Sequence, residues 1–232
     1  MIRLRACVAF LFALLATTCA NTEKVIFTAP PPLELPTTDP VFDALYLGTL
    51  RPGFSSIRAS LKVAFATTDQ PYGLDAWFLL RDLQPDQRHE VRVCWAATQP
   101  TAFRLETFSI ATVFDTPELV QGLAAYSDDQ RRAIDLQDFP IVGNKREQET
   151  HESLLFLRVQ AAADFFSSNR TLMHHPPDVD IDLILDPYLG NIFPKSLVPT
   201  ALYTVGLAVG GWWISGIFWK RLFSDEAKPH TD

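Results

Sequence analysis

The densest group of side chains able to do chemistry lies between residues 174 and 182. It contains two histidines and three alternating aspartates: His174, His175, Asp178, Asp180 and Asp182. Imidazole and carboxylate groups bind zinc or manganese-like ions, which makes His174, His175 and Asp178 the candidate metal ligands. Two prolines interrupt the group, however, and the spacing matches no standard site. Alternating aspartates on a strand are typical of a solvated face, so we predict no metal site here.

Other sequence motifs for catalysis are missing from the chain. It has no GxSxG, HExxH or CxxC sequence and no glycine-rich phosphate loop. We therefore expect no catalytic residue and no cofactor. The net charge of -7, without a basic patch of useful size, argues against a nucleic-acid partner. A lumenal enzyme that uses the histidine and aspartate group stays open as an alternative.

Two further features concern modification. Asn169 begins the sequence Asn-Arg-Thr, an acceptor for N-glycosylation in a secreted or lumenal segment. Cys94 lies in the apolar run VRVCWAA, where we expect a buried, inert thiol. The two other cysteines fall within the first twenty residues.

The first twenty residues have the pattern of a secretory signal peptide. Arg3 and Arg5 precede a short apolar run, and Thr18 and Ala20 place small residues before a cleavage point at Asn21. An uncleaved anchor is the alternative. The apolar run is shorter than the roughly 20 residues that span a bilayer, which favours cleavage.

The other end of the chain predicts a transmembrane helix over residues 199–219. This stretch is uncharged and covers roughly 30 Å as a helix, about one hydrocarbon core. Lys220 and Arg221 follow at once, and cations at that position favour the cytosolic side. The expected topology is single-pass type I, with the bulk of the chain lumenal or extracellular. A buried core helix and a glycolipid anchor are the alternatives.

Small residues in this helix indicate a packing face for a partner helix. Gly206 and Gly210 form a GxxxG pair, and Gly211 and Ser215 lie on a neighbouring stripe. Small side chains let a second membrane helix approach closely. Glycine is also simply frequent in membrane helices, so both interpretations stay open.

Between the two ends, alternating apolar residues predict an antiparallel β-sandwich. Strand patterns occupy residues 56–67, 75–83, 89–97, 102–113 and 179–185, and short turns separate most of them. Residues 153–166 fit a strand or a short helix, and Thr116-Pro117-Glu118 can open a short helix. The fold class is therefore mainly β, with one C-terminal transmembrane α-helix. The expected organisation is a signal peptide (1–20), a Pro-rich lead-in (21–41), a lumenal sandwich (42–186) with a polar or helical insertion near 115–152, a juxtamembrane segment (187–198), the membrane helix (199–219) and a cytosolic tail (220–232).

One stretch of about thirty residues carries a family resemblance. It reads WFLLRDLQPDQRHEVRVCWAATQPTAFRLETF, with Leu83 and Pro85 in a turn and Val91 and Val93 in the strand that follows. It resembles the later half of a fibronectin type III domain. That family usually has a tyrosine, whose hydroxyl bonds upstream backbone, where this chain has His89. The resemblance implies a sandwich and, by analogy, adhesion or protein binding.

The segment before the helix, DPYLGNIFPKSL, is unusually apolar for a connector. We expect it to lie at the lumenal membrane interface or against a neighbouring subunit. Together these features predict a non-enzymatic accessory subunit of a membrane complex in the endoplasmic reticulum, for example one for glycan or glycolipid assembly. Its expected partner is a membrane protein that binds the helix and this segment. A cell-surface adhesion module at the plasma membrane is the alternative.

Overall fold

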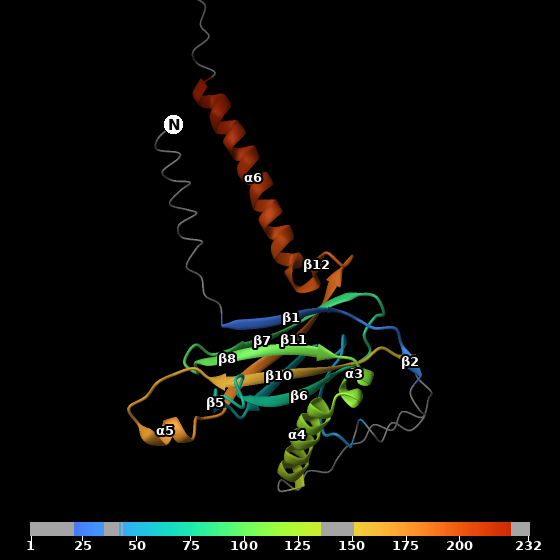
Figure 1. Cartoon of the computed structure of the whole chain (residues 1–232). Helices are drawn as coiled ribbons and strands as arrows, with labels where there is room; N and C mark the ends of the chain where they lie inside the picture. Colours follow the sequence, from blue (N-terminus) through green and yellow to red (C-terminus); the bar gives the residue numbers. More distant parts are fainter. Residues whose placement is uncertain (1–20, 35–41, 43, 136–150, 224–232) are drawn as a thin grey trace, which may run out of the picture.

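Two β-sheets pack face to face in the computed structural model, which describes residues 21–34, 42, 44–135 and 151–223 (Figure 1). The first sheet has four main strands, and a short fifth strand pairs with the end of the third. In spatial order they are β1 (Thr22–Thr28), β7 (Arg88–Trp95), β11 (Val179–Leu189) and β4 (Ser56–Leu61), with β12 (Phe193–Pro194) beside the end of β11. All pairs in this sheet are antiparallel.

The second sheet is built around a strand that the sequence left undecided. Residues 153–166 supply its central strand, which pairs with a long strand on either side. The order is β3 (Gly48–Leu50), β6 (Leu74–Leu80), β10 (Leu155–Ala163) and β8 (Thr101–Phe108), with β5 (Ala64–Phe65) also beside β10. The short pairs β3–β6 and β10–β5 are parallel, and the long pairs are antiparallel. A two-stranded sheet joins β2 (Leu33–Glu34) to β9 (His151–Glu152).

The core lies between the two sheets and follows the period-2 alternation of the strands. Val91 and Val93 of β7 and Ile181 and Leu183 of β11 point inward from the first sheet, while Phe78 belongs to the second. Burial of such side chains stabilises a fold by roughly 1.5–3 kcal/mol each. The predicted mainly β sandwich is therefore confirmed.

Two helices cover the outer face of the second sheet. They are α3 (Ile110–Asp115) and α4 (Pro117–Asp135), and they bury Val113, Leu119 and Leu123 against Trp77 and Phe156. The prediction of one strand over 102–113 was wrong at its end, because Ser109 caps α3 by accepting a hydrogen bond from the Thr112 amide at 3.1 Å. The predicted short helix at 116–118 opens a helix of 19 residues.

Other boundaries differ from the sequence pattern in smaller ways. The run 56–67 forms two strands, β4 and β5, which belong to different sheets. The last strand continues beyond residue 185 to Leu189, so the juxtamembrane segment expected from residue 187 begins inside a strand. Residues 1–20, 136–150 and 224–232, which include the predicted signal peptide, lie outside the described residues.

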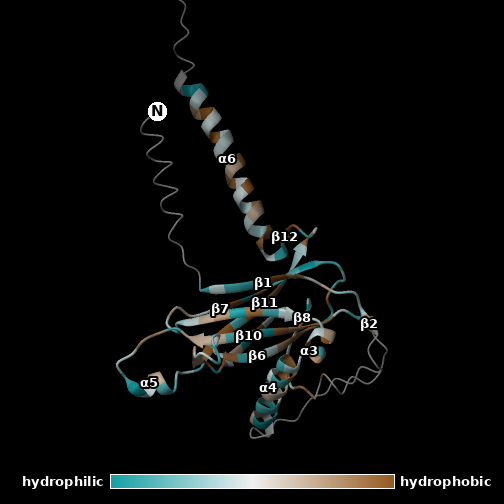
Figure 2. Cartoon of the chain, in the orientation of Figure 1, coloured by the Kyte–Doolittle hydropathy of each residue, from teal (hydrophilic) through white to brown (hydrophobic). Residues whose placement is uncertain are grey.

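The chain leaves the sandwich through a single long helix. A short helix α5 (Arg170–His174) precedes β11, and the 3-10 turn η1 (Lys195–Leu197) leads into α6 (Val198–Phe223). The stretch Lys195–Arg221 is long and apolar enough to cross a membrane, and none of its most apolar window is buried inside the protein. Figure 1 shows α6 and α4 on opposite sides of the sandwich. Figure 2 shows apolar colours along α6, with hydrophilic colour near its far end.

Candidate functional site

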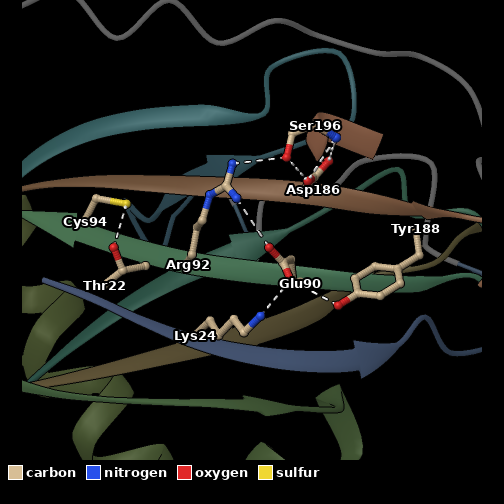
Figure 3. A network of polar contacts seen from close by, with 8 residues as sticks. All are labelled: Thr22, Lys24, Glu90, Arg92, Cys94, Asp186, Tyr188 and Ser196. Atoms are coloured by element: carbon tan, nitrogen blue, oxygen red, sulfur yellow. Dashed lines mark hydrogen bonds and ion pairs between the residues drawn. The ribbon is translucent and has the colours of Figure 1, made fainter. Parts of the chain in front are cut away.

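A network of polar side chains lies where the sandwich meets the membrane helix. It joins Lys24 of β1, Glu90 and Arg92 of β7, Asp186 and Tyr188 of β11, and Ser196 of η1 (Figure 3). We call these six residues the base network. They come together because alternate positions of the three strands point away from the core, opposite to Val91 and Leu185.

Glu90 is the centre of the base network. Its side chain is only 3% exposed, and a buried carboxylate needs partners to offset its lost hydration. Lys24 Nζ and Arg92 Nη1 each lie 3.5 Å from a Glu90 carboxylate oxygen. The Tyr188 hydroxyl donates to the same carboxylate at 3.1 Å. Burial, followed by this hydrogen bond, raises the pKa of Tyr188, so the phenol stays protonated as a donor at neutral pH.

Asp186 connects the sheet to the turn that begins the membrane helix. Both of its carboxylate oxygens lie 3.2 Å from the backbone nitrogen of Ser196, and the Ser196 hydroxyl donates to one of them as well. Arg92 Nη2 donates to the Ser196 hydroxyl at 3.3 Å. Hydrogen bonds to charged groups contribute about 1.5–3 kcal/mol each, so η1 is held firmly to two strands.

Charge balance explains why the cations are needed. Glu90 and Asp186 are direct cross-strand partners in the register of β7 and β11, and like charges in that position repel. Lys24 and Arg92 both pair with Glu90. Arg92 also donates to the Ser196 hydroxyl, which in turn donates to Asp186. Removal of either cation would leave the pair of carboxylates partly uncompensated.

His89 fills the other side of the same strand. It is fully buried and stacks on Phe27, with ring centroids 5.7 Å apart. Its Nδ1 lies 3.0 Å from the Gln87 carbonyl oxygen, which can only accept, so Nδ1 carries the proton. Burial lowers the pKa of His89, while the Gln87 carbonyl opposes that effect. The imidazole is thus a neutral core group at neutral pH.

The base network is suited to holding elements together. Both carboxylates accept from cations, the backbone or hydroxyl groups, and the one histidine beside the network in the sequence points into the core. Within the described residues of the network, therefore, neither a base-activated nucleophile nor an available acid–base pair is present. The arrangement fastens η1, the turn that leads into α6, to β7 and β11.

The histidine and aspartate group that contains the candidate metal ligands is divided between α5, the loop after it and β11. His174 ends α5, His175 caps it, and Asp178 precedes β11. No group of three or more His, Cys, Asp or Glu side chains that could hold a metal ion occurs in the described part of the chain. Asp182, on β11, instead forms a two-point ion pair with Arg58 at 2.8 and 2.9 Å.

A pocket of about 310 Å³ opens beside α5, with Asp178 on its wall. Most of its lining is apolar, including Val63, Phe165 and Leu172. The Gln99 side-chain amide, its largest neutral polar group, already donates to the Asp178 carbonyl and accepts from the Asp180 amide, both at 3.3 Å. This leaves few convergent polar groups for a ligand.

The remaining predicted sites lie outside the buried core. Asn169 caps α5 through its side-chain oxygen, which accepts from the Thr171 amide at 3.0 Å and leaves its nitrogen available. Cys94 is half-buried on the outer face of β7, near the Thr22 hydroxyl, so the expectation of a buried thiol was wrong. Gly206, Gly210 and Gly211 face open space on α6.

The base network itself was missed in the sequence. Its signal was present as polar residues at alternate positions of an otherwise apolar strand, Glu90 and Arg92, and as Asp186 just before an apolar segment. Periodicity predicts that such residues share the outer face of a strand. It does not predict that β7 and β11 are neighbours, and the network depends on that pairing.

Comparison with known proteins adds the functional family. The family model for Pga1, described as GPI-Mannosyltransferase II co-activator, matches residues 11–139, more than half of the chain. None of the curated proteins and none of the solved structures matches it. The matched range includes Lys24, Glu90 and Arg92 of the base network and ends before β10. The chain therefore belongs to the Pga1 family of GPI-mannosyltransferase II co-activators.

Proposed function

We propose that this chain supports the mannosyltransferase from the lumenal side of the endoplasmic reticulum membrane. In this proposal α6 lies in the bilayer beside the enzyme, and the sandwich stands at a fixed angle to the membrane. The observation that carries the proposal is the base network, because it ties Ser196, two residues before α6, to β7 and β11. A flexible linker would let the sandwich turn freely, whereas this junction orients it.

We propose that the co-activator acts by holding its sandwich in a fixed position beside the enzyme. The family acts without catalytic activity of its own, and the carboxylates of the base network are committed to holding the fold. A rigid lumenal body next to a membrane enzyme can stabilise the enzyme's own lumenal segments in their active arrangement. Such an effect is a shift in the enzyme's conformational equilibrium by differential binding.

Three sequence features support the lumenal orientation. The first twenty residues have the pattern of a signal peptide. Lys220 and Arg221 lie in the last turn of α6, where cations favour the cytosolic side. Asn169, in an N-glycosylation sequence, is exposed on the sandwich.

The small residues of α6 provide two possible contact faces for the enzyme. Gly206 and Gly210 are four residues apart and share one face of the helix. Gly211 and Ser215 share another, roughly 140° around the axis from Gly206 at about 100° per residue. We propose that the enzyme's membrane helices pack on one of these faces, where a small side chain allows close approach.

The experiment that tests the role of the base network compares two aspartates on the same strand. Asp186→Ala removes the acceptor that holds Ser196, whereas Asp182→Ala removes only the exposed pair with Arg58. Each variant replaces the wild-type chain in cells, and mannosyltransferase activity is measured in microsomes that contain equal amounts of co-activator. We expect a severalfold loss of activity with Asp186→Ala and near-normal activity with Asp182→Ala. Equal activity of the two variants would rule out orientation by the base network.

A further inference from the structure

We propose that the turn between β11 and β12 is a lipid-contacting site, which enters the interfacial region of the bilayer beside α6. This inference rests on the proposed location of α6 in the membrane. The turn exposes Leu189 and Ile192, which are 61% and 83% exposed, and Phe193 is partly exposed beside them. Bulky apolar side chains at such exposure normally mark a contact surface when they gather in one place.

The backbone of the turn is built to hold this shape. Gly190 and Asn191 both have positive φ, 59° and 60°, and the Ile192 amide donates to the Leu189 carbonyl at 3.2 Å. Two successive residues with positive φ are typical of a type I′ hairpin turn, for which glycine and asparagine are the preferred residues. The exposed side chains therefore flank a tight turn with a defined backbone conformation, which connects β11 to β12.

Hydrogen bonds from the turn before β7 hold the hairpin in place. Asn191 accepts from the Arg88 amide at 2.9 Å and donates to the Asp86 carbonyl at 3.0 Å. Gln87 donates from its side chain to the Tyr188 carbonyl at 2.9 Å. These contacts cross about a hundred residues of sequence, and they fix the hairpin at one position on the sandwich.

That position is next to the start of the membrane helix. Only η1 separates β12 from α6, and the base network fixes Ser196 of η1 to the sheet. Figure 1 shows the β12 hairpin beside the first turn of α6, on the side toward which the helix rises. A chain whose α6 enters the bilayer at Val198 thus brings the hairpin to the membrane surface.

The charges around the hairpin favour a phospholipid surface as the occupant. Arg88 and Lys195 are exposed, and Arg88 lies over the Tyr188 ring with its guanidinium carbon 5.3 Å from the centroid. Cations beside apolar side chains match the phosphate and upper acyl levels of a bilayer. The helix continuous with the hairpin is itself apolar enough to lie in lipid. The observations thus point to lipid in preference to a protein surface.

The test measures the depth of the hairpin in lipid in the absence of the enzyme. Full-length protein with its own cysteines replaced by serine receives one cysteine at Ile192→Cys, and in a second variant at Leu189→Cys. Each is labelled with the environment-sensitive fluorophore NBD and reconstituted into vesicles of phosphatidylcholine and phosphatidylserine. Nitroxide-labelled lipids then quench the fluorophore according to depth.

Two control positions define the outer limits of the measurement. Phe166→Cys lies in the segment between β10 and α5, where the native side chain is 90% exposed. Ile214→Cys lies within α6. We expect strong quenching at 189 and 192 by nitroxides near the headgroup, deeper quenching at 214, and fluorescence at 166 close to that of a water-exposed label.

The outcomes separate this inference from the proposed function. Quenching at 214 with water-like fluorescence at 189 and 192 would overturn the inference and leave α6 in the bilayer. Water-like fluorescence at 214 would overturn the membrane location of α6, and the inference with it. Protection of 189 and 192 only after addition of the mannosyltransferase would identify the hairpin as a protein contact and would also overturn the inference.

Discussion

Glu152 and Arg81 form the most enclosed ion pair described in this chain. The Arg81 Nε and Nη2 atoms donate to the two carboxylate oxygens at 2.9 and 2.6 Å, and the Asp82 amide donates at 3.1 Å. A two-point guanidinium–carboxylate pair fixes geometry as well as charge. It joins the end of β6 to β9, so one pair of residues holds segments about seventy positions apart. As in the base network, every buried charge here is matched.

Substitution of Glu152 is expected to give a pH-dependent loss of stability. Burial alone would raise the pKa of Glu152, but Arg81 and the Asp82 amide lower it below the usual value of 4.5. A carboxylate with a lowered pKa stabilises the fold above about pH 4.5, and that contribution is lost as the pH falls through the folded pKa. Glu152→Gln should therefore lower the free energy of unfolding by about 2–4 kcal/mol at pH 7. The difference in stability between this variant and wild type should become smaller as the pH falls.

The measurement is the thermal midpoint of the full chain in detergent micelles between pH 7 and pH 3. Asp182→Asn is the matched control, because its Arg58 partner is highly exposed and surface pairs contribute little. A difference between wild type and Glu152→Gln that stays constant over this pH range would contradict the assignment.

At the scale of elements, periodicity predicted which side chains of a strand face the core, but it could not predict which strands are neighbours in a sheet. The alternation in β7 and β11 identifies Val91 and Leu183 as inward-facing, since side chains alternate along any strand. The order β1-β7-β11-β4 pairs segments far apart in sequence, and it depends on the packing of the whole core. For the same reason β10, with few β-branched residues, could not be distinguished from a helix until its two neighbours were known. The base network could not be predicted without this order.

A close backbone approach between β6 and β10 gives a prediction for one glycine. Gly73 has a φ of 76°, and a Cβ at this position would lie 2.1 Å from the Ala161 carbonyl oxygen. Gly73→Ala should therefore destabilise the fold by at least about 2 kcal/mol. Within the described residues, no heavy atom lies within 4 Å of a Cβ added at Gly53, so Gly53→Ala should be near neutral. Equal thermal midpoints for the two variants would refute the close approach.

The membrane helix carries a prediction about which of its faces binds the enzyme. Replacement of Gly206 and Gly210 by isoleucine fills one face, and replacement of Gly211 and Ser215 fills the other. We expect one pair to reduce co-purification with the mannosyltransferase in mild detergent several-fold and the other to leave it nearly unchanged, since close helix packing needs small residues at the contact. Undiminished recovery of the mannosyltransferase with both double variants would show that neither face is the contact.

At the scale of the whole molecule, the prediction of a non-enzymatic accessory subunit of a membrane complex in the endoplasmic reticulum is confirmed by the family. The inference succeeded because an apolar helix and the absence of catalytic motifs restrict function more strongly than the sandwich does. The fibronectin type III resemblance of residues 77–108 stays a prediction, because none of the solved structures matches the chain. The identity of the enzyme came from the family alone, since neither composition nor fold specifies a partner.

Orientation across the membrane can be read from one side chain. If the sandwich is lumenal, Asn169 should carry a glycan, because it is exposed and its side-chain nitrogen is available. Treatment of the wild-type chain with an endoglycosidase that cleaves high-mannose glycans should then increase its gel mobility. Asn169→Gln and Thr171→Ala should each abolish the shift. Digestion of the sandwich by protease added outside sealed microsomes would disprove the orientation.

The junction at Ser196 couples the orientation of the sandwich to the thickness of the membrane. With 26 residues, α6 is about 39 Å long, and a helix that exceeds the local hydrocarbon thickness leans over to fit. If α6 lies in the bilayer as proposed, the hydrogen bonds that hold Ser196 to β7 and β11 transmit such a tilt to the sandwich. The binding of this co-activator to its enzyme should then depend on the thickness of the surrounding bilayer.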